Sequence, residues 1–153
     1  MRFRTFLAGC LGGLLSLNSC TNSPDMTDYA AYVNPFIGTG GHGHTFPGAI
    51  LPHGMISPSP DTRIDGWDAC SGYYYADSTI NGFSHTHLSG TGCCDYGDVL
   101  LMPTVGEQKY LPTGSQSQKM AYASSFSHQN ETAEPGYYSV FLDTYQVKAE
   151  LTA

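Results

Sequence analysis

The chain has 153 residues, the length of one ordinary domain, with room for a hydrophobic core. It carries 13 acidic residues against six basic ones, a formal net charge of −7. An acidic chain without a basic patch is repelled by phosphate backbones, which argues against nucleic acid as a partner.

Residues 1–19 have the layout of a secretory signal peptide. Arg2 and Arg4 precede an apolar segment, residues 6–17, that is too short to cross a bilayer as a helix. The segment ends in Leu-Asn-Ser-Cys, which resembles the lipobox of bacterial lipoproteins and predicts acylation of Cys20. Residues 20–31 would then be the lipidated Cys and a polar tether, and a lipid anchor would be the only membrane contact. A plain cleavable signal with an incidental Cys is the alternative.

These features predict an exported protein, and we expect it in the periplasm or on the outer membrane of a Gram-negative bacterium. Removing Arg2 and Arg4 leaves four basic residues against 13 acidic ones, a net formal charge of −9. The exported part would therefore suit a neutral or cationic ligand better than an anionic one.

Residues 32–153 are predicted to form an all-β domain, a β-sandwich. Helical periodicity is nearly absent there, and glycine and proline separate short apolar runs. Strands are expected at 83–88, at 99–102 as a buried strand, at 137–142 and at 145–152, where apolar and polar residues alternate. Asp143 and Thr144 would turn the last two strands into a hairpin, and residues 114–125 would be a loop or a short surface helix.

The chain ends at Ala153 directly after the alternating strand, without a turn signal or polar tail. We therefore expect it to be the N-terminal piece of a longer protein. Outside the signal and Cys20, three cysteines remain: Cys70, Cys93 and Cys94. At most one disulfide can join Cys70 to one of the adjacent pair, and buried free thiols are the favoured interpretation.

Histidines gather in two places in the region 34–103. If residues 83–88 are extended, His85 and His87 project from the same face, where they could contact a ligand or a metal ion. His42 and His44 alternate with glycines in a loop. They are either ordinary surface histidines or hydrogen-bonding partners of a hydroxylated ligand.

Trp67 is the only tryptophan, and it lies between Asp65 and Asp68. An indole can stack on the C–H face of a sugar while carboxylates accept its hydroxyl hydrogens, so this segment suits a carbohydrate. A Trp that closes one end of a sandwich is the alternative. Asp61, Asp65 and Asp68 could supply the carboxyl pair of a glycosidase, although solvated loop carboxylates are the usual explanation.

An ordered series of motifs resembles the N-terminal domain of glycoside hydrolase family 92, a family of exo-acting α-mannosidases. The resemblance runs from Tyr32 to the last residue. The motifs are Tyr-Val-Asn-Pro-Phe-Ile-Gly-Thr-Gly (32–40), Gly-His-Thr-Phe-Pro-Gly-Ala (43–49), Pro-His-Gly-Met (52–55), Ser-Pro-Asp-Thr-Arg (59–63), Gly-Trp-Asp (66–68) and Gly-Phe-Ser-His-Thr-His-Leu-Ser-Gly-Thr-Gly (82–92).

The resemblance implies a β-sandwich followed by an (α/α)6-barrel catalytic domain, with the active site at their junction. It implies a calcium-dependent, inverting mechanism whose general acid and base belong to the barrel, so no residue of this chain is expected to be catalytic. No calcium ligand is assignable in this segment. Trp67 is expected to line the subsite beyond the scissile bond, and the further substrate contacts are expected to be Asp68, His85, His87, His42 and His44.

The leading hypothesis is therefore the N-terminal part of an α-mannosidase that acts on mannose-containing glycans. Its partner would be its own catalytic domain, without which the fragment should be inactive. One alternative is a non-catalytic carbohydrate-binding lipoprotein that uses the same surface. A protein that binds metal through histidines is a more distant alternative.

Overall fold

The computed structural model describes residues 27–63, 66–93, 97–107 and 120–153. The signal peptide, Cys20, Asp65, Cys94 and the first part of the 114–125 segment therefore lie outside the described residues. The elements in chain order are the 3-10 helix η1 (Tyr29–Tyr32), β1 (Ser59–Asp61), β2 (Thr79–Ile80), β3 (Gly82–Ser84), β4 (Leu100–Leu101), β5 (Ser124–Ser125), the 3-10 helix η2 (His128–Asn130), β6 (Glu131–Glu134), β7 (Tyr137–Leu142) and β8 (Val147–Thr152).

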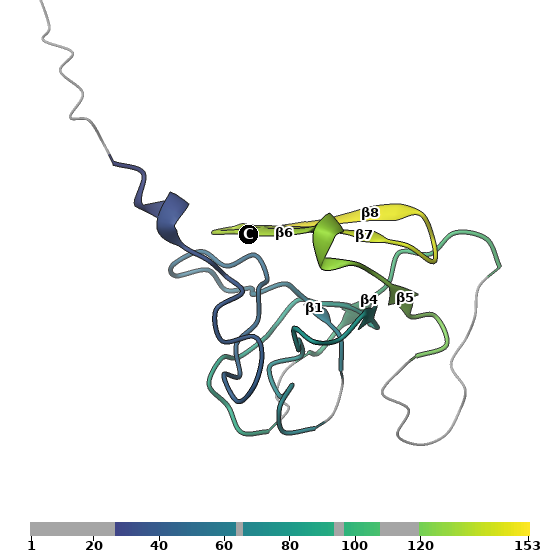
Figure 1. Cartoon of the computed structure of the whole chain (residues 1–153), viewed down its shortest axis with the longest axis horizontal. Coiled ribbons are helices and arrows are strands. Elements are labelled where there is room, and N and C mark those ends of the chain that lie inside the picture. Colours follow the sequence, from purple (N-terminus) through teal and green to yellow (C-terminus); the bar gives the residue numbers. More distant parts are fainter. Residues whose placement is uncertain (1–26, 64–65, 94–96, 108–119) are drawn as a thin grey trace, which may run out of the picture.

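The strands form three antiparallel sheets, in the orders β1-β3-β4, β2-β5 and β6-β7-β8. Figure 1 shows the β6-β7-β8 sheet nearly edge-on, lying over the layer that contains β1, β4 and β5. The described residues contain no α-helix. Their helices are the short 3-10 helices η1 and η2, and neither is long and apolar enough to cross a membrane. The predicted all-β sandwich is confirmed.

The C-terminal hairpin follows from its alternating sequence. The predicted strand 137–142 matches β7, and β8 alternates between half-buried and exposed residues along its length. Leu142 pairs with Val147 across the hairpin. The last strand begins two residues later than predicted, because Gln146 adopts a left-handed φ of 54° and belongs to the four-residue connection.

The core lies between the sheets. Tyr138, Val140 and Leu142 alternate on the inner face of β7, and all three are fully buried. They pack in one cluster with Phe83 from β3 and Ile80 from β2, so the cluster joins all three sheets. Phe46, Tyr73 and Phe126, which lie outside the strands, complete the cluster.

Two strand predictions need correction, and one strand of four residues was missed. The strand expected at 83–88 covers only Gly82–Ser84, and the residues after it leave the sheet. The strand expected to be buried at 99–102 is Leu100–Leu101, and Leu101 is 67% exposed because β4 is an edge strand. β6 was not predicted. A Pro-Gly turn at 135–136, with Gly136 at a φ of 76°, connects it to β7.

A buried carboxylate ties β6 to the core. Both Tyr73 and Tyr138 donate hydrogen bonds to Glu131, at 3.0 and 2.6 Å, and Nδ1 of His128 lies 2.6 Å from its second oxygen. The Glu131 side chain is 1% exposed. Burial and the neighbouring carboxylate raise the pKa of both tyrosines well above the usual range, so their hydroxyls remain donors.

We expect Glu131→Gln to lower the free energy of unfolding by about 1–3 kcal/mol, because the amide group would direct donors at buried hydroxyls that need acceptors. Urea denaturation would measure the change. Glu134→Gln, at an exposed position of the same strand, should change stability by less than about 0.5 kcal/mol. Equal losses in the two variants would contradict a special role for the buried carboxylate.

Candidate functional site

Four of the six predicted contact residues meet at one place, which we call the His-Trp corner: His42, His44, Trp67 and Asp68. The two histidines lie on a closed loop in which Thr45 N donates to Gly38 O at 3.3 Å. A Cβ atom at Gly43 would lie 2.1 Å from that same carbonyl oxygen. Only glycine therefore fits between the two histidines.

His44 is held at the centre of the corner. Its backbone adopts a left-handed φ of 53°, which is uncommon for histidine. Its carbonyl oxygen accepts hydrogen bonds from Ser71 Oγ at 2.6 Å and from Gly90 N at 2.8 Å. These two bonds join the histidine loop to segments 27 and 46 residues away, so the position of the ring depends on tertiary contacts.

Trp67 packs edge-to-face against His44, with ring centroids 4.8 Å apart at an interplanar angle of 83°. The side of the indole is in contact with the backbone at Gly92, where a Cβ would lie 2.6 Å from Cζ3. Even so, Trp67 remains 59% exposed. It is therefore not a plug in the core, and part of its ring is available to a ligand.

Asp68 follows Trp67 and contacts the other histidine. Its Oδ1 lies 2.7 Å from Nδ1 of His42, and the two side chains are 39% and 78% exposed. At such exposure the pair contributes little to stability, about 0–1 kcal/mol. An exposed indole beside an imidazole and a carboxylate can offer a flat apolar face together with hydrogen-bonding groups.

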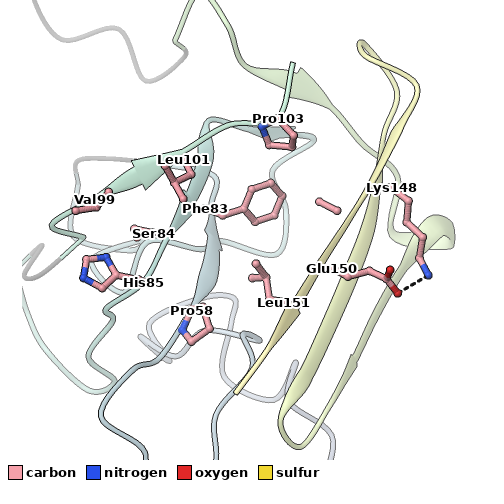
Figure 2. A pocket seen from close by; sticks show the side chains of 11 residues that line it. Pro58, Phe83, Ser84, His85, Val99, Leu101, Pro103, Lys148, Glu150 and Leu151 are labelled. Carbon is pink, nitrogen blue, oxygen red and sulfur yellow. Dashed lines mark hydrogen bonds and ion pairs between the residues drawn. The ribbon is translucent and has the colours of Figure 1, made fainter. Parts of the chain in front are cut away.

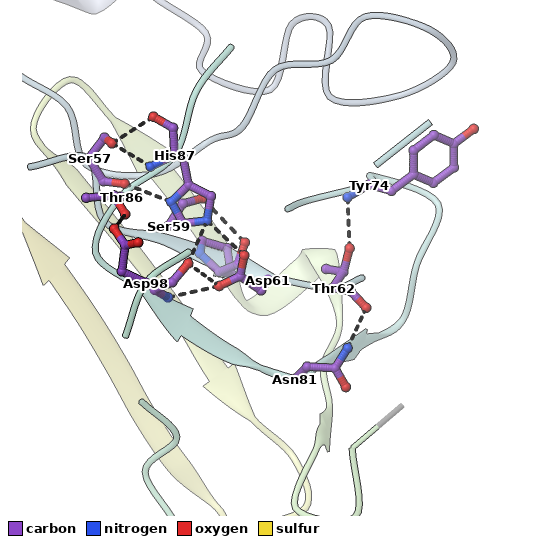
Figure 3. A network of polar contacts seen from close by, with 11 residues as sticks. Ser57, Ser59, Asp61, Thr62, Tyr74, Asn81, Thr86, His87 and Asp98 are labelled. Atoms are coloured by element: carbon purple, nitrogen blue, oxygen red, sulfur yellow. Dashed lines mark hydrogen bonds and ion pairs between the residues drawn. The ribbon is translucent and has the colours of Figure 1, made fainter. Parts of the chain in front are cut away.

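His87 lies elsewhere, inside a buried polar network that also includes Asp61 (Figure 3). Its Nε2 lies 2.8 Å from Asp61 Oδ1, and its Nδ1 lies 2.8 Å from the carbonyl oxygen of Ser57. Asp61 also accepts bonds from the amide and hydroxyl of Ser84. Gly72 leaves room for this carboxylate, because a Cβ there would lie 2.4 Å from Oδ1. Both ring nitrogens of His87 are thus used within the fold.

His85 faces a third environment. It lines an apolar groove of about 570 Å³ between β3 and β4 on one side and β8 on the other, together with Phe83, Leu101 and Leu151 (Figure 2). The prediction that His85 and His87 form a pair on one strand face does not hold, because β3 ends at Ser84. The structure does not bring either of them to the His-Trp corner.

The remaining candidates are distributed as follows. Asp61, considered as a glycosidase carboxylate, is buried and bonded to His87 and Ser84. Cys70 and Cys93 are free thiols, which agrees with the favoured interpretation, but of these two only Cys70 is buried.

Ser71 was not predicted to belong to the site, although it follows the Gly-Trp-Asp motif closely. No local pattern indicates that its hydroxyl holds the His44 carbonyl.

A family model described as the glycosyl hydrolase family 92 N-terminal domain matches residues 32–153, which span every element of the sandwich except the start of η1. This chain belongs to family 92. The match includes all four residues of the corner and the motifs on which the predicted resemblance rested.

Solved structures of family 92 proteins share both sequence and fold with the chain. An α-mannosidase from Bacteroides thetaiotaomicron, solved with mannoimidazole, is 50% identical with a TM-score of 0.74, covering 81% of this chain and 16% of that one. An inverting mannosidase from the same organism is 32% identical with a TM-score of 0.63, covering 86% and 17%. A protein of Arthroderma benhamiae named as a secreted glycosidase is 34% identical over 126 residues.

The chain therefore spans about a sixth of the length of these relatives. Calcium, which the resemblance implies, does not fit the residues described. Ca²⁺ takes six to eight oxygen ligands. The one group of three or more candidate ligand side chains in the described residues, His42, His44 and Asp68, offers two imidazoles and a single carboxylate.

Proposed function

We propose that this chain is the N-terminal, substrate-contacting part of an exported family 92 α-mannosidase that removes terminal mannose from glycans. The observation that carries the proposal is the 50% identity, over 81% of the chain, to a family 92 α-mannosidase. The exposed Trp67 in the His-Trp corner supports it, because the domain offers the kind of surface that a sugar ring can stack on.

In this proposal the corner forms one wall of the subsite beyond the scissile bond. The exposed part of the indole would stack on the leaving sugar, while His42 and Asp68 would hydrogen-bond its hydroxyls. His44 would hold the indole in place through the edge-to-face contact. We do not extend the contact role to His87, whose nitrogens are engaged, and His85 would take part only if the substrate reached the apolar groove.

The reactive groups would come from another part of the protein. An inverting glycosidase needs two carboxyl groups about 6.5–9.5 Å apart, one as acid and one as base, on opposite sides of the bond. In this chain Asp61 is buried and already bonded, and Asp68 would contact the leaving sugar. We propose that the chain alone hydrolyses nothing. Any calcium ligands would likewise lie outside the residues described here.

Export and anchoring are part of the same proposal. The signal-like residues 1–19 support export, as does the relative named as a secreted glycosidase. We propose that Cys20 carries the lipid and that the protein resides in the periplasm or outer membrane. Metabolic labelling with a palmitate analogue should mark the wild type and leave Cys20→Ser unmarked. A labelled Cys20→Ser variant would reject the anchor.

The test of function compares the protein encoded by the whole reading frame with the 153-residue chain. The longer protein should release mannose from α-linked mannose disaccharides, and NMR should detect the β-anomer first, as inversion requires. The chain alone should release none. No hydrolysis by either form, combined with binding of mannose-terminated glycans by the chain, would favour the non-catalytic carbohydrate-binding lipoprotein instead.

A further inference from the structure

We propose that His42, His44 and Asp68 form a binding site for a divalent transition metal ion, with Zn²⁺ as the best-matched ion. One donor atom from each of these side chains lies within 4.8 Å of the other two. No other three His, Cys, Asp or Glu side chains of the described residues come together in this way. The site goes beyond the contact with sugar proposed above and does not depend on hydrolysis.

The chemistry of the donors selects the metal. Imidazole nitrogens and a carboxylate oxygen bind Zn²⁺ at about 2.0–2.2 Å, so two ligands of one tetrahedral ion lie about 3.4 Å apart. A donor separation of 4.8 Å must therefore shorten by about 1.4 Å, while the 2.7 Å between His42 and Asp68 must lengthen by about 0.7 Å. His42 can make this movement, because its side chain is 78% exposed. The ion would replace the direct 2.7 Å contact between His42 and Asp68.

A second observation points to a ligand at the same place. Nε2 of His44 is buried and has no hydrogen-bond partner, and it is the only buried side-chain polar atom found in this condition in the described parts of the chain. Native proteins rarely leave such a group unmatched. Ser71 and Gly90 also fix the His44 backbone in an uncommon conformation, so His44 is already positioned before an ion binds.

Three protein ligands leave at least one coordination position open to water, unlike the closed sites of structural zinc. Because the His42 side chain is 78% exposed and that of Asp68 is 39% exposed, solvent would reach the ion. It would also lie beside Trp67, which contacts His44. Zn²⁺ would therefore compete with a sugar hydroxyl for the same imidazole and carboxylate.

The experiment measures metal binding by the full chain with any affinity tag removed, free thiols blocked with iodoacetamide and metal stripped with EDTA. Zn²⁺ is added in competition with a chromophoric chelator, and Ca²⁺ is tested in parallel. Wild-type protein should take up one equivalent of Zn²⁺ and no Ca²⁺. His42→Ala and Asp68→Asn should each weaken the affinity for Zn²⁺ at least about tenfold.

Two further variants complete the design. His44→Asn should weaken Zn²⁺ binding as strongly as His42→Ala and Asp68→Asn do. Asn is chosen because it tolerates the left-handed backbone that His44 adopts. His53→Asn is the matched control: His53 also has a positive φ but is exposed and lies outside the site, so this variant should leave the affinity unchanged. Melting curves of the metal-free variants verify that each is folded. Failure of the wild type to bind one equivalent, or equal affinity in the wild type, His42→Ala and Asp68→Asn, would overturn the site.

Discussion

Asp61→Ala is expected to lower the free energy of unfolding by about 3–5 kcal/mol, because it removes a buried carboxylate that accepts from Ser84 and contacts His87. Its oxygens lie 2.8 Å from His87 Nε2 and 2.6 Å from Ser84 Oγ, and the amide of Ser84 donates to it at 2.9 Å. The His87 and Asp61 side chains are only 3% and 9% exposed, so water would not readily replace the lost partner. Urea denaturation followed by fluorescence measures the change.

Asp98→Ala is the matched control. Asp98 is exposed and accepts one side-chain hydrogen bond, from Thr86 at 2.8 Å (Figure 3). Asp98→Ala should lower the free energy of unfolding by less than about 1 kcal/mol. If the two aspartates gave the same loss, the buried network around His87 could not be what holds this part of the sandwich together.

Trp67→Ala is expected to reduce kcat/KM for a mannose disaccharide by about 10- to 100-fold in the complete enzyme, a loss of about 1.4–2.7 kcal/mol in binding the transition state. The effect follows from losing the stacking face beneath the leaving sugar, and it rests on the proposed function. The same variant should hydrolyse α-mannosyl fluoride at nearly the wild-type rate, because a fluoride leaving group does not occupy that subsite.

Two controls separate this role from a structural one. The thermal midpoint should change little in Trp67→Ala, because the side chain is 59% exposed. Tyr29→Ala removes another exposed aromatic residue, in η1, and should leave both substrates unaffected. A Trp67→Ala variant that unfolds, or that loses activity equally on the fluoride and the disaccharide, would argue against the subsite.

The hairpin of β7 and β8 was predictable because its signal is local. Alternation with a period of two assigns Val147, Ala149 and Leu151 to one face, and the structure packs Ala149 and Leu151 against the core. The short strands were not predictable in the same way. β3 and β4 contain three and two residues, and their lengths depend on which neighbours pair with them, not on any repeating pattern.

The histidines illustrate the same difference. His85 and His87 are two residues apart, yet one lines an apolar groove and the other lies in a buried polar network, because the chain leaves the sheet after Ser84. His42 and Asp68 are 26 residues apart and come within 2.7 Å. Sequence spacing describes a face only while the secondary structure is regular.

By itself, the sequence determined the all-β class, the C-terminal hairpin and the motifs that identify family 92, since alternation, turn residues and ordered motifs are all written locally along the chain. Only the tertiary structure decided which candidates belong together. The His-Trp corner exists because Ser71 and Gly90 both bond to the carbonyl of His44 and bring three distant segments into contact. Such long-range hydrogen bonds form only once the core has brought those segments together, so no local pattern records them.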